Sequence, residues 1–319
     1  MMDFGLHLGT RGAAAEPDGL ARIARHAEAM GFAYLGFSDH IVIARQVDSV
    51  YPYNESGDWP AVGTGTCLEQ LTVLTYAAAV TSTIRLLTSV MVLPYRPAIL
   101  AAKVLATADV LSKGRLTVGI GVGWMAEEMM LLGSPPFAQR GAAGDEYIRA
   151  FRTLWSEADP AYAGRHVNFG GLRFEPKPVQ KPGPPIWVGG ETAAARRRAG
   201  RLGDGWYPVG SNPRAFLDSP GAFAEGLAEV RRHAEEAGRD PAAVDTGFYA
   251  NWYRLGEPAP GRDGGRRVFT GPAQTIAEDV HAYGEAGLRH LVIGFESDDL
   301  ARTLEEIERF AHEVMPLAG

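Results

Sequence analysis

A short apolar run, a loop and a helix-like stretch recur in that order along the chain, and this repeat limits the fold more than any other feature. Eight apolar runs predict eight strands, at residues 4–8, 34–37, 85–92, 115–120, 185–188, 205–209, 246–254 and 290–295. Apolar residues spaced by three and four between or after these runs predict helices. Strands that alternate with helices form parallel sheets, and eight units favour closure into a single (β/α)8 TIM barrel over residues 1–319. An open doubly wound sheet is the alternative, but its glycine fingerprint is absent after the first predicted strand.

Composition restricts the class of protein and its partners. The chain carries 38 acidic and 31 basic side chains, for a net charge of −7. An acidic surface repels phosphate backbones, so we expect no nucleic-acid partner. The N-terminus lacks a basic segment followed by an apolar one, and no apolar run approaches the roughly 20 residues that span a bilayer, which predicts no signal peptide and no membrane span. Cys67 is the only cysteine, which excludes an intrachain disulfide and fits the reducing cytoplasm.

Two stretches interrupt the repeat. Residues 42–66 follow the second predicted strand, are rich in Pro, Gly, Asp and Tyr, and predict a long loop over the barrel mouth. Residues 159–184 contain five prolines and predict an insertion between strands four and five. Either segment is equally compatible with a lid or with solvent-exposed padding.

The candidate catalytic residues are those that follow the predicted strands, because active sites of such barrels lie at the strand C-termini. Asp39 and His40 directly follow the second strand. An imidazole titrates near neutral pH and can donate or accept a proton beside a redox ring. The alternative is a structural histidine held by a nearby carboxylate. Four further side chains are reserve candidates for proton transfer: Glu127, Glu128, Tyr51 and Tyr53.

Strands three and four end in residues that suit a flat ligand. Ser89 and Val90 belong to a stretch where small polar groups precede apolar ones, a surface on which a flat ring can stack, although a simple buried strand has the same pattern. Gly121 and Gly123 would let a bulky ligand approach the backbone, and Trp124 would line its pocket. Glycine-rich strand ends also occur without ligands.

The fifth strand leads through a glycine pair into a helix. Gly189 and Gly190 end the strand, and Glu191 and Thr192 precede the helix. Free backbone N–H groups at a helix N-terminus bind anions, so we expect a phosphate here. The alternative is that Glu191 and Thr192 are ordinary helix caps. The sequence has no HExxH, CxxC, GxSxG or GxxxxGK[ST] motif, so we expect no catalytic metal, no hydrolase and no nucleotide kinase.

Taken in order, these segments resemble the luciferase-like superfamily of flavin and deazaflavin oxidoreductases, and the resemblance covers essentially the whole chain. It is carried by SDH at 38–40, TSVMVLPYRPAILAAK at 88–103, GRLTVGIGVGWMAEEMMLLG at 114–133, RGAAGDEYIRAFRTLW at 140–155, FEPKPVQKPGPPIWVGGE at 174–191 and GDGW at 203–206. The resemblance implies a (β/α)8 barrel that binds an isoalloxazine-type ring at its C-terminal mouth, and usually a homodimer. Helices near 68–80 and 98–111 carry small residues that we expect at that interface: Ala77, Ala78, Ala79, Ala101, Ala102, Ala106 and Ala108.

The SDH and GWMAEE runs are most similar to members that use coenzyme F420, a deazaflavin that carries hydride. By that similarity Asp39 and His40 lie beside the ring, and Ser89–Val90 is the site of a non-proline cis peptide that bulges toward it. Residues 189–192 match the phosphate loop. The sugar-phosphate dehydrogenases of this group differ, because they carry a glutamate where this chain has Trp124 and a tryptophan where it has Ala44.

The resemblance implies an enzyme acting on a small-molecule substrate, with F420 as the expected cofactor. One alternative is an FMN-dependent monooxygenase that uses oxygen and a separate flavin reductase; another is a non-catalytic flavin-binding barrel. A deazaflavin has carbon where flavin forms its oxygen adduct, so the two enzyme classes differ in their chemistry. The sequence does not identify the substrate, because the mouth loops that select it carry no fold-level signature.

Overall fold

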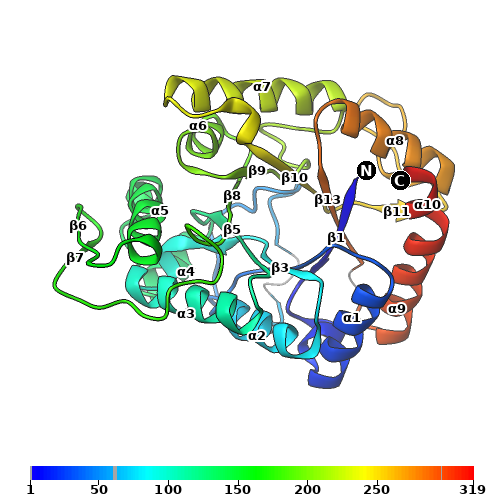
Figure 1. Cartoon of the computed structure of the whole chain (residues 1–319). Helices are drawn as coiled ribbons and strands as arrows, with labels where there is room; N and C mark the ends of the chain where they lie inside the picture. The colour runs from blue at the N-terminus through cyan, green and yellow to red at the C-terminus, as the bar shows by residue number, and fades with distance from the viewer. Residues whose placement is uncertain (1, 60–62, 296) are drawn as a thin grey trace.

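A computed structural model describes residues 2–59, 63–295 and 297–319 of the chain. Its centre is a ring of parallel strands surrounded by helices (Figure 1). The ring runs in the order β3, β2, β1, β13, β10, β9, β8, β5, and a β3–β5 pairing closes it. The single TIM barrel predicted from the repeat is therefore confirmed. The strands of the ring are β1 (Asp3–Leu8), β2 (Tyr34–Phe37), β3 (Arg85–Thr88), β5 (Leu116–Gly121), β8 (Ile186–Gly189), β9 (Gly205–Tyr207), β10 (Asp245–Ala250) and β13 (His290–Gly294). The short strand β4 (Met91–Val92) belongs to the same sheet.

The predicted third strand is divided into β3 and β4, both of which pair with β5. The predicted seventh strand is shorter than expected, because β10 ends at Ala250. The main helices are α1 (Pro17–Ala29), α2 (Gln70–Val80), α3 (Ala98–Leu111), α5 (Arg140–Ser156), α6 (Ala193–Leu202), α7 (Pro220–Glu236), α8 (Ala273–Glu285) and α9 (Leu300–Arg309). Shorter elements are α4 (Ala126–Leu131), α10 (Met315–Ala318), η1 (Gly12–Ala15), η2 (Leu93–Tyr95), η3 (Phe137–Gln139), η4 (Pro241–Ala243), the π-helical turn η5 (Phe310–Val314), and the strand pairs β6 (Tyr162–Ala163) with β7 (Asn168–Phe169) and β11 (Arg254–Leu255) with β12 (Thr270–Gly271).

Alternation along each strand produces two hydrophobic cores. Leu6 of β1 faces the outer core between strands and helices, where it is fully buried with Ile23 and Phe310. The inner core fills the barrel with large rings, among them Trp187 and Tyr207. Successive strand residues point to opposite sides, so one strand serves both cores.

The N-terminal end of the barrel is closed by a buried histidine. His290 Nε2 is 3.0 Å from Asp245 Oδ2, and His290 Nδ1 is 3.1 Å from Asp3 Oδ2 in an ion-pair contact that lacks hydrogen-bond alignment. Its ring also lies 4.9 Å from that of Trp187. Contacts with two carboxylates and with an aromatic ring thus close the N-terminal end of the barrel.

The two insertions differ in position. In the described part of 42–66 there is no helix or strand, as expected for a long loop; residues 60–62 lie outside the described residues. The insertion between strands four and five contains the β6–β7 hairpin, which lies beyond α5 on the outside of the barrel (Figure 1). Glu146 of α5 holds it by accepting hydrogen bonds from the backbone N–H groups of residues 165–167.

The small residues expected at a subunit interface are mostly buried within the chain. Ala77, Ala101 and Ala106 are fully buried, and α3 packs between α2 and α5. Of the seven alanines, only Ala79 is exposed. Their small size therefore allows helices of one barrel to approach each other closely. Among the described residues, no helix is long and apolar enough to cross a membrane.

Candidate active site

The predicted site residues lie directly after β2, between β3 and β4, and at or just after the ends of β5 and β8. Because these strands are parallel, their C-terminal ends lie at the same end of the barrel, and the folded chain brings the four groups to one mouth.

The carboxylate of Asp39 makes hydrogen bonds to other parts of the chain. It is buried, and its carboxylate accepts hydrogen bonds from Arg96 Nη1 at 2.9 Å, Arg96 Nη2 at 2.8 Å and the Val92 backbone N–H at 2.8 Å. Arg96 is also paired with Glu69. A bidentate pair of this kind fixes geometry. Asp39 therefore holds β4 against the end of β2, and its predicted place beside a cofactor ring stays a prediction.

His40 pairs with a glutamate 88 residues away in the sequence. Its Nδ1 lies 2.7 Å from Glu128 Oε2, and the side chains are 12% and 0% exposed. A carboxylate accepts hydrogen bonds, so this contact places the ring proton on Nδ1 and leaves Nε2 as the free position of a neutral imidazole. Within the described part of the chain, Nε2 has no hydrogen-bond partner. His40 is thus oriented on one side and available on the other.

Both glutamates of α4 hold the loop that follows β2. Glu128 Oε1 accepts from the backbone N–H groups of Ile41 at 2.7 Å and Val42 at 3.1 Å, and its Oε2 also accepts from Tyr95 Oη at 2.9 Å. Glu127 Oε1 accepts from two further loop N–H groups, those of residues 48 and 49, at 2.9 and 3.0 Å. Glu128 is the fully buried one of the two, and its bonds occupy both of its oxygens, which weakens its reserve role in proton transfer.

Aromatic rings from two loops surround His40. The Trp59 ring lies 4.2 Å from the imidazole at 32°, and the Trp124 ring lies 6.2 Å from it nearly at a right angle. Tyr51 contacts Trp124 at 5.2 Å, and Tyr53 contacts Tyr51 at 5.5 Å. Trp124 therefore lies beside His40, and its expected role in lining a ligand pocket stays a prediction; the sequence did not indicate that Trp59 reaches His40.

The Ser89–Val90 peptide is cis, as the resemblance implies. Ser89 Oγ is hydrogen-bonded to Tyr207 Oη at 2.8 Å. A Cβ added at Gly121 would lie 2.8 Å from Val90 Cγ2, and one at Gly189 would lie 3.0 Å from Val90 Cγ1. These two glycines therefore make room for the half-buried Val90 side chain, and the expectation that Gly121 also admits a ligand to the backbone stays a prediction. A Cβ added at Gly123 would meet the side chain of a valine of β4 instead.

The loop after β8 contains the residue that caps helix α6 and a buried glutamate. Gly190 has φ +104°, which favours glycine, and Thr192 caps α6 by accepting from the Ala195 N–H at 3.3 Å. Glu191 is only 2% exposed and turns inward, where it accepts from the Val209 N–H at 2.6 Å and from Asn212 Nδ2 at 2.9 Å. Burial raises its pKa from 4.5 to about 7. Thr192 is thus a cap, whereas Glu191 holds the loop after β9.

Two of the four arginines of α6 pair with acids of neighbouring helices on the outside of the barrel. Arg196 Nη1 lies 2.8 Å from Glu229 of α7, and Arg198 pairs with Asp145 of α5. Arg196 and Arg198 thus join α6 to the helices beside it, whereas Arg197 and Arg201 are exposed.

A second polar group at the mouth was missed from the sequence. His7 lies at the end of β1, with Nε2 3.2 Å from Ser38 Oγ and Nδ1 3.0 Å from Tyr249 Oη. The His7 and Tyr249 rings stack at 4.3 Å. The available signal was the inward alternation of β1, which puts His7 on the barrel side while Leu6 and Leu8 face the helices.

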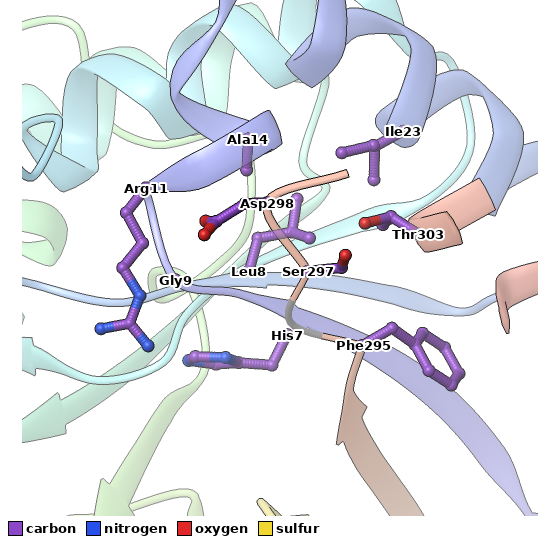
Figure 2. A pocket seen from close by; sticks show the side chains of 10 residues that line it. All are labelled: His7, Leu8, Gly9, Arg11, Ala14, Ile23, Phe295, Ser297, Asp298 and Thr303. Carbon is purple, nitrogen blue, oxygen red and sulfur yellow. The ribbon is translucent and has the colours of Figure 1, made fainter. Parts of the chain in front are cut away.

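A cavity of about 240 Å³ lies beside His7, between the ends of β1 and β13 and the helices α1 and α9 (Figure 2). Arg11 and Asp298 line its polar side, and Ile23 and Phe295 contribute apolar walls. None of the site residues predicted from the sequence lines this cavity. Within the described residues, no group of three or more His, Cys, Asp or Glu side chains could hold a metal ion.

Comparisons with known proteins define the class. The family model for luciferase-like monooxygenases matches residues 2–254. The chain therefore belongs to the luciferase-like monooxygenase family, whose members are oxidoreductases and monooxygenases. An FMNH2-dependent dimethylsulfone monooxygenase of Pseudomonas putida is 29% identical over 291 residues, which cover 78% of each chain.

Two solved structures have the same fold at low identity. A coenzyme F420-dependent tetrahydromethanopterin reductase from Methanopyrus kandleri gives a TM-score of 0.77 at 18% identity, over 100% of this chain and 99% of that one. An F420-dependent secondary alcohol dehydrogenase, solved with an F420–acetone adduct, gives 0.76 at 18% identity with the same coverage. The curated relative is thus described with FMNH2, and the two structural neighbours are described with F420.

Proposed function

We propose that this protein is a coenzyme F420-dependent oxidoreductase that transfers a hydride to or from an oxygen-bearing carbon of a small organic substrate. The observation that carries the proposal is the His40–Glu128 pair, which orients an imidazole at the mouth and leaves Nε2 available. Oxidation of an alcohol carbon releases a proton from its oxygen, and reduction of a carbonyl consumes one, so the site needs such a group. The two F420-dependent structural neighbours support the choice of cofactor.

The residues at the mouth fit a flat ring with an anionic tail. Val90 is an apolar, partly exposed side chain held between two glycines, and it suits the face of a planar ring. The backbone N–H groups at the start of the ten-residue helix α6, after Gly190, suit a phosphate. Glu191 lies beneath this loop, and its raised pKa keeps its negative charge partial near neutral pH. We infer that Val90 supports the ring and that residues 190–192 bind the phosphate.

When bound, a deazaflavin accepts or supplies a hydride. During oxidation of an alcohol, Nε2 of His40 takes the hydroxyl proton as the hydride leaves the adjacent carbon. Glu128 stabilises the resulting imidazolium through Nδ1–H, in the manner of other carboxylate–imidazole pairs. During reduction, the imidazolium returns this proton to the carbonyl oxygen. Tyr95 keeps Glu128 in place through its hydroxyl.

The FMN-dependent monooxygenase is the competing function, supported by the dimethylsulfone monooxygenase relative. It would need a separate flavin reductase as a partner. Titration of the purified protein with F420 and with FMN, followed by oxygen consumption and anaerobic hydride exchange against alcohols and ketones, separates the two. We expect tighter binding of F420 and exchange without oxygen uptake. Oxygen uptake with reduced FMN would favour the monooxygenase, and binding without turnover would favour a non-catalytic flavin-binding barrel.

We also propose that the protein is a cytoplasmic homodimer. Five large apolar side chains exposed on α3 and α4 support an interface there: Ile99, Leu100, Leu111, Met130 and Leu131. Analytical ultracentrifugation at micromolar concentration tests this proposal, and a purely monomeric species would refute it.

A further inference from the structure

The side chains around the free nitrogen of His40 indicate which substrates the site accepts. Tyr51, Trp59 and Trp124, which we call the aromatic wall, are each partly exposed at the mouth. The Trp59 and Trp124 rings meet edge to face at 5.9 Å, and Tyr51 meets Trp124 in the same way. Aromatic faces exposed beside a polar group bind flat apolar bodies while the polar group fixes their orientation.

The aromatic wall is fixed to the barrel at several points. The Ser49 hydroxyl accepts a hydrogen bond from the Ala126 N–H at 3.0 Å, next to the glutamate that binds the same stretch of loop. At the other side of the mouth, Ser211 Oγ donates to the carbonyl oxygen of Tyr53 at 3.0 Å. The loop is therefore hydrogen-bonded to the segments that follow both β5 and β9, and its rings have defined positions.

Two arginines near this region are held by other contacts. Arg96 is neutralised by two carboxylates, and Arg140 donates to the carbonyl oxygens of Gly123 and Phe137 at 3.1 and 2.9 Å. The Arg140 guanidinium also stacks on the Phe137 ring at 3.8 Å. A substrate phosphate or carboxylate that bound to either arginine would have to draw its guanidinium away from these contacts, which costs more than binding a neutral group.

Resting on the proposed function, we propose that the substrate is an uncharged ketone or secondary alcohol with a flat apolar or aromatic body. Its body lies against the aromatic wall, and its oxygen lies at Nε2 of His40. Trp59 is the specificity-determining residue, because its ring touches the imidazole itself.

Trp59→Ala tests this with three probes: acetophenone, acetone and glucose 6-phosphate. Dissociation constants are measured by ligand-observed NMR on the protein without cofactor, and kcat/KM values for the two ketones on the cofactor-loaded enzyme. An aromatic contact of this type corresponds to about three- to tenfold in affinity. We expect acetophenone to lose that factor in binding and in kcat/KM, while acetone is unchanged and glucose 6-phosphate binds more weakly than acetophenone throughout.

Two further variants keep the test decisive. Trp59→Phe retains a flat ring and should restore most of the acetophenone affinity, which a folding defect in the alanine variant would not mimic. Tyr76→Ala removes an exposed ring from α2, away from the mouth, and should leave both ketones unaffected. Equal changes for both ketones, or tighter binding of glucose 6-phosphate, would overturn the inference. Because binding is measured without cofactor, the inference can fail while hydride transfer stands, and the reverse also holds.

Discussion

The two ends of the barrel each contain a buried histidine beside a carboxylate, and they differ in what the second ring nitrogen contacts. At the N-terminal end, His290 has Asp245 on one nitrogen and Asp3 on the other. At the C-terminal mouth, His40 has Glu128 on Nδ1, and within the described residues its Nε2 is open. A histidine paired on both sides can only hold strands together, whereas one paired on a single side can exchange a proton. We therefore propose a structural role for His290 at one end and a catalytic role for His40 at the other.

The largest effect is expected at the mouth. His40→Ala removes the proton carrier, and positioned acid–base groups contribute about a hundred- to ten-thousand-fold to rate. We expect turnover to fall at least about a hundredfold while cofactor affinity changes much less. Steady-state kinetics and cofactor titration of the same preparation measure both quantities. Near-normal turnover on the true substrate would break the comparison, and the proton carrier would then be sought at the His7–Tyr249 pair or at Tyr51.

The opposite result is expected at the closed end. His290→Ala removes a ring that packs on Trp187 and leaves two carboxylates without their partner. We expect a loss of about 2 kcal/mol in the free energy of unfolding, measured by urea denaturation. Turnover per folded molecule should stay within about threefold of the wild type. A large loss of turnover with unchanged stability would show that the closed end also affects the chemistry.

A third variant tests the pairing rather than the imidazole. Glu128→Gln keeps an oxygen for the loop N–H groups but removes the charge that stabilises an imidazolium at His40. We expect turnover to fall about tenfold, less than for His40→Ala, with a shifted pH–rate profile. Steady-state rates between pH 5 and 9 measure this. A profile identical to that of the wild type would reduce Glu128 to a loop anchor.

The positions of the strands and of their ends could be predicted from the sequence, whereas most side-chain contacts at the mouth could not. Periodicity located all eight barrel strands, and strand ends indicated where His40, Trp124 and the α6 loop would meet, because parallel strands share one C-terminal end. The contacts between particular side chains could not be predicted from periodicity or from strand ends. The His40–Glu128 contact joins residues from two different loops, and no local pattern in either loop specifies it.

Loop residues show the same limit. Trp59 lies in a stretch without helix or strand, so no periodicity indicates the direction of its ring. Glu191 has the sequence position of a helix cap, yet Thr192 takes that role and Glu191 is buried. Gly121 was predicted to admit a ligand to the backbone and Gly189 to belong to the phosphate loop, and neither prediction indicated that both glycines leave space for Val90, a packing detail that depends on several strands at once.

Unlike the two histidines, which lie beside charged carboxylates, the buried carboxyl group of Glu191 has two uncharged hydrogen-bond partners, the Val209 N–H and the Asn212 side chain. Burial raises its pKa from 4.5 to about 7. Between these two pH values the folded protein keeps a proton that the unfolded chain has released, so a rise in pH favours unfolding. Below pH 4.5 and above pH 7 the two states bind equal numbers of protons, so Glu191 no longer makes stability depend on pH. The wild type should therefore lose about 1 kcal/mol of stability between pH 5.5 and 6.5 relative to Glu191→Gln, whose amide oxygen can still accept from Val209. Urea denaturation of both proteins at the two pH values measures the difference. Parallel stability curves would mean that Glu191 is ionised throughout this range, and that its charge faces the phosphate loop permanently.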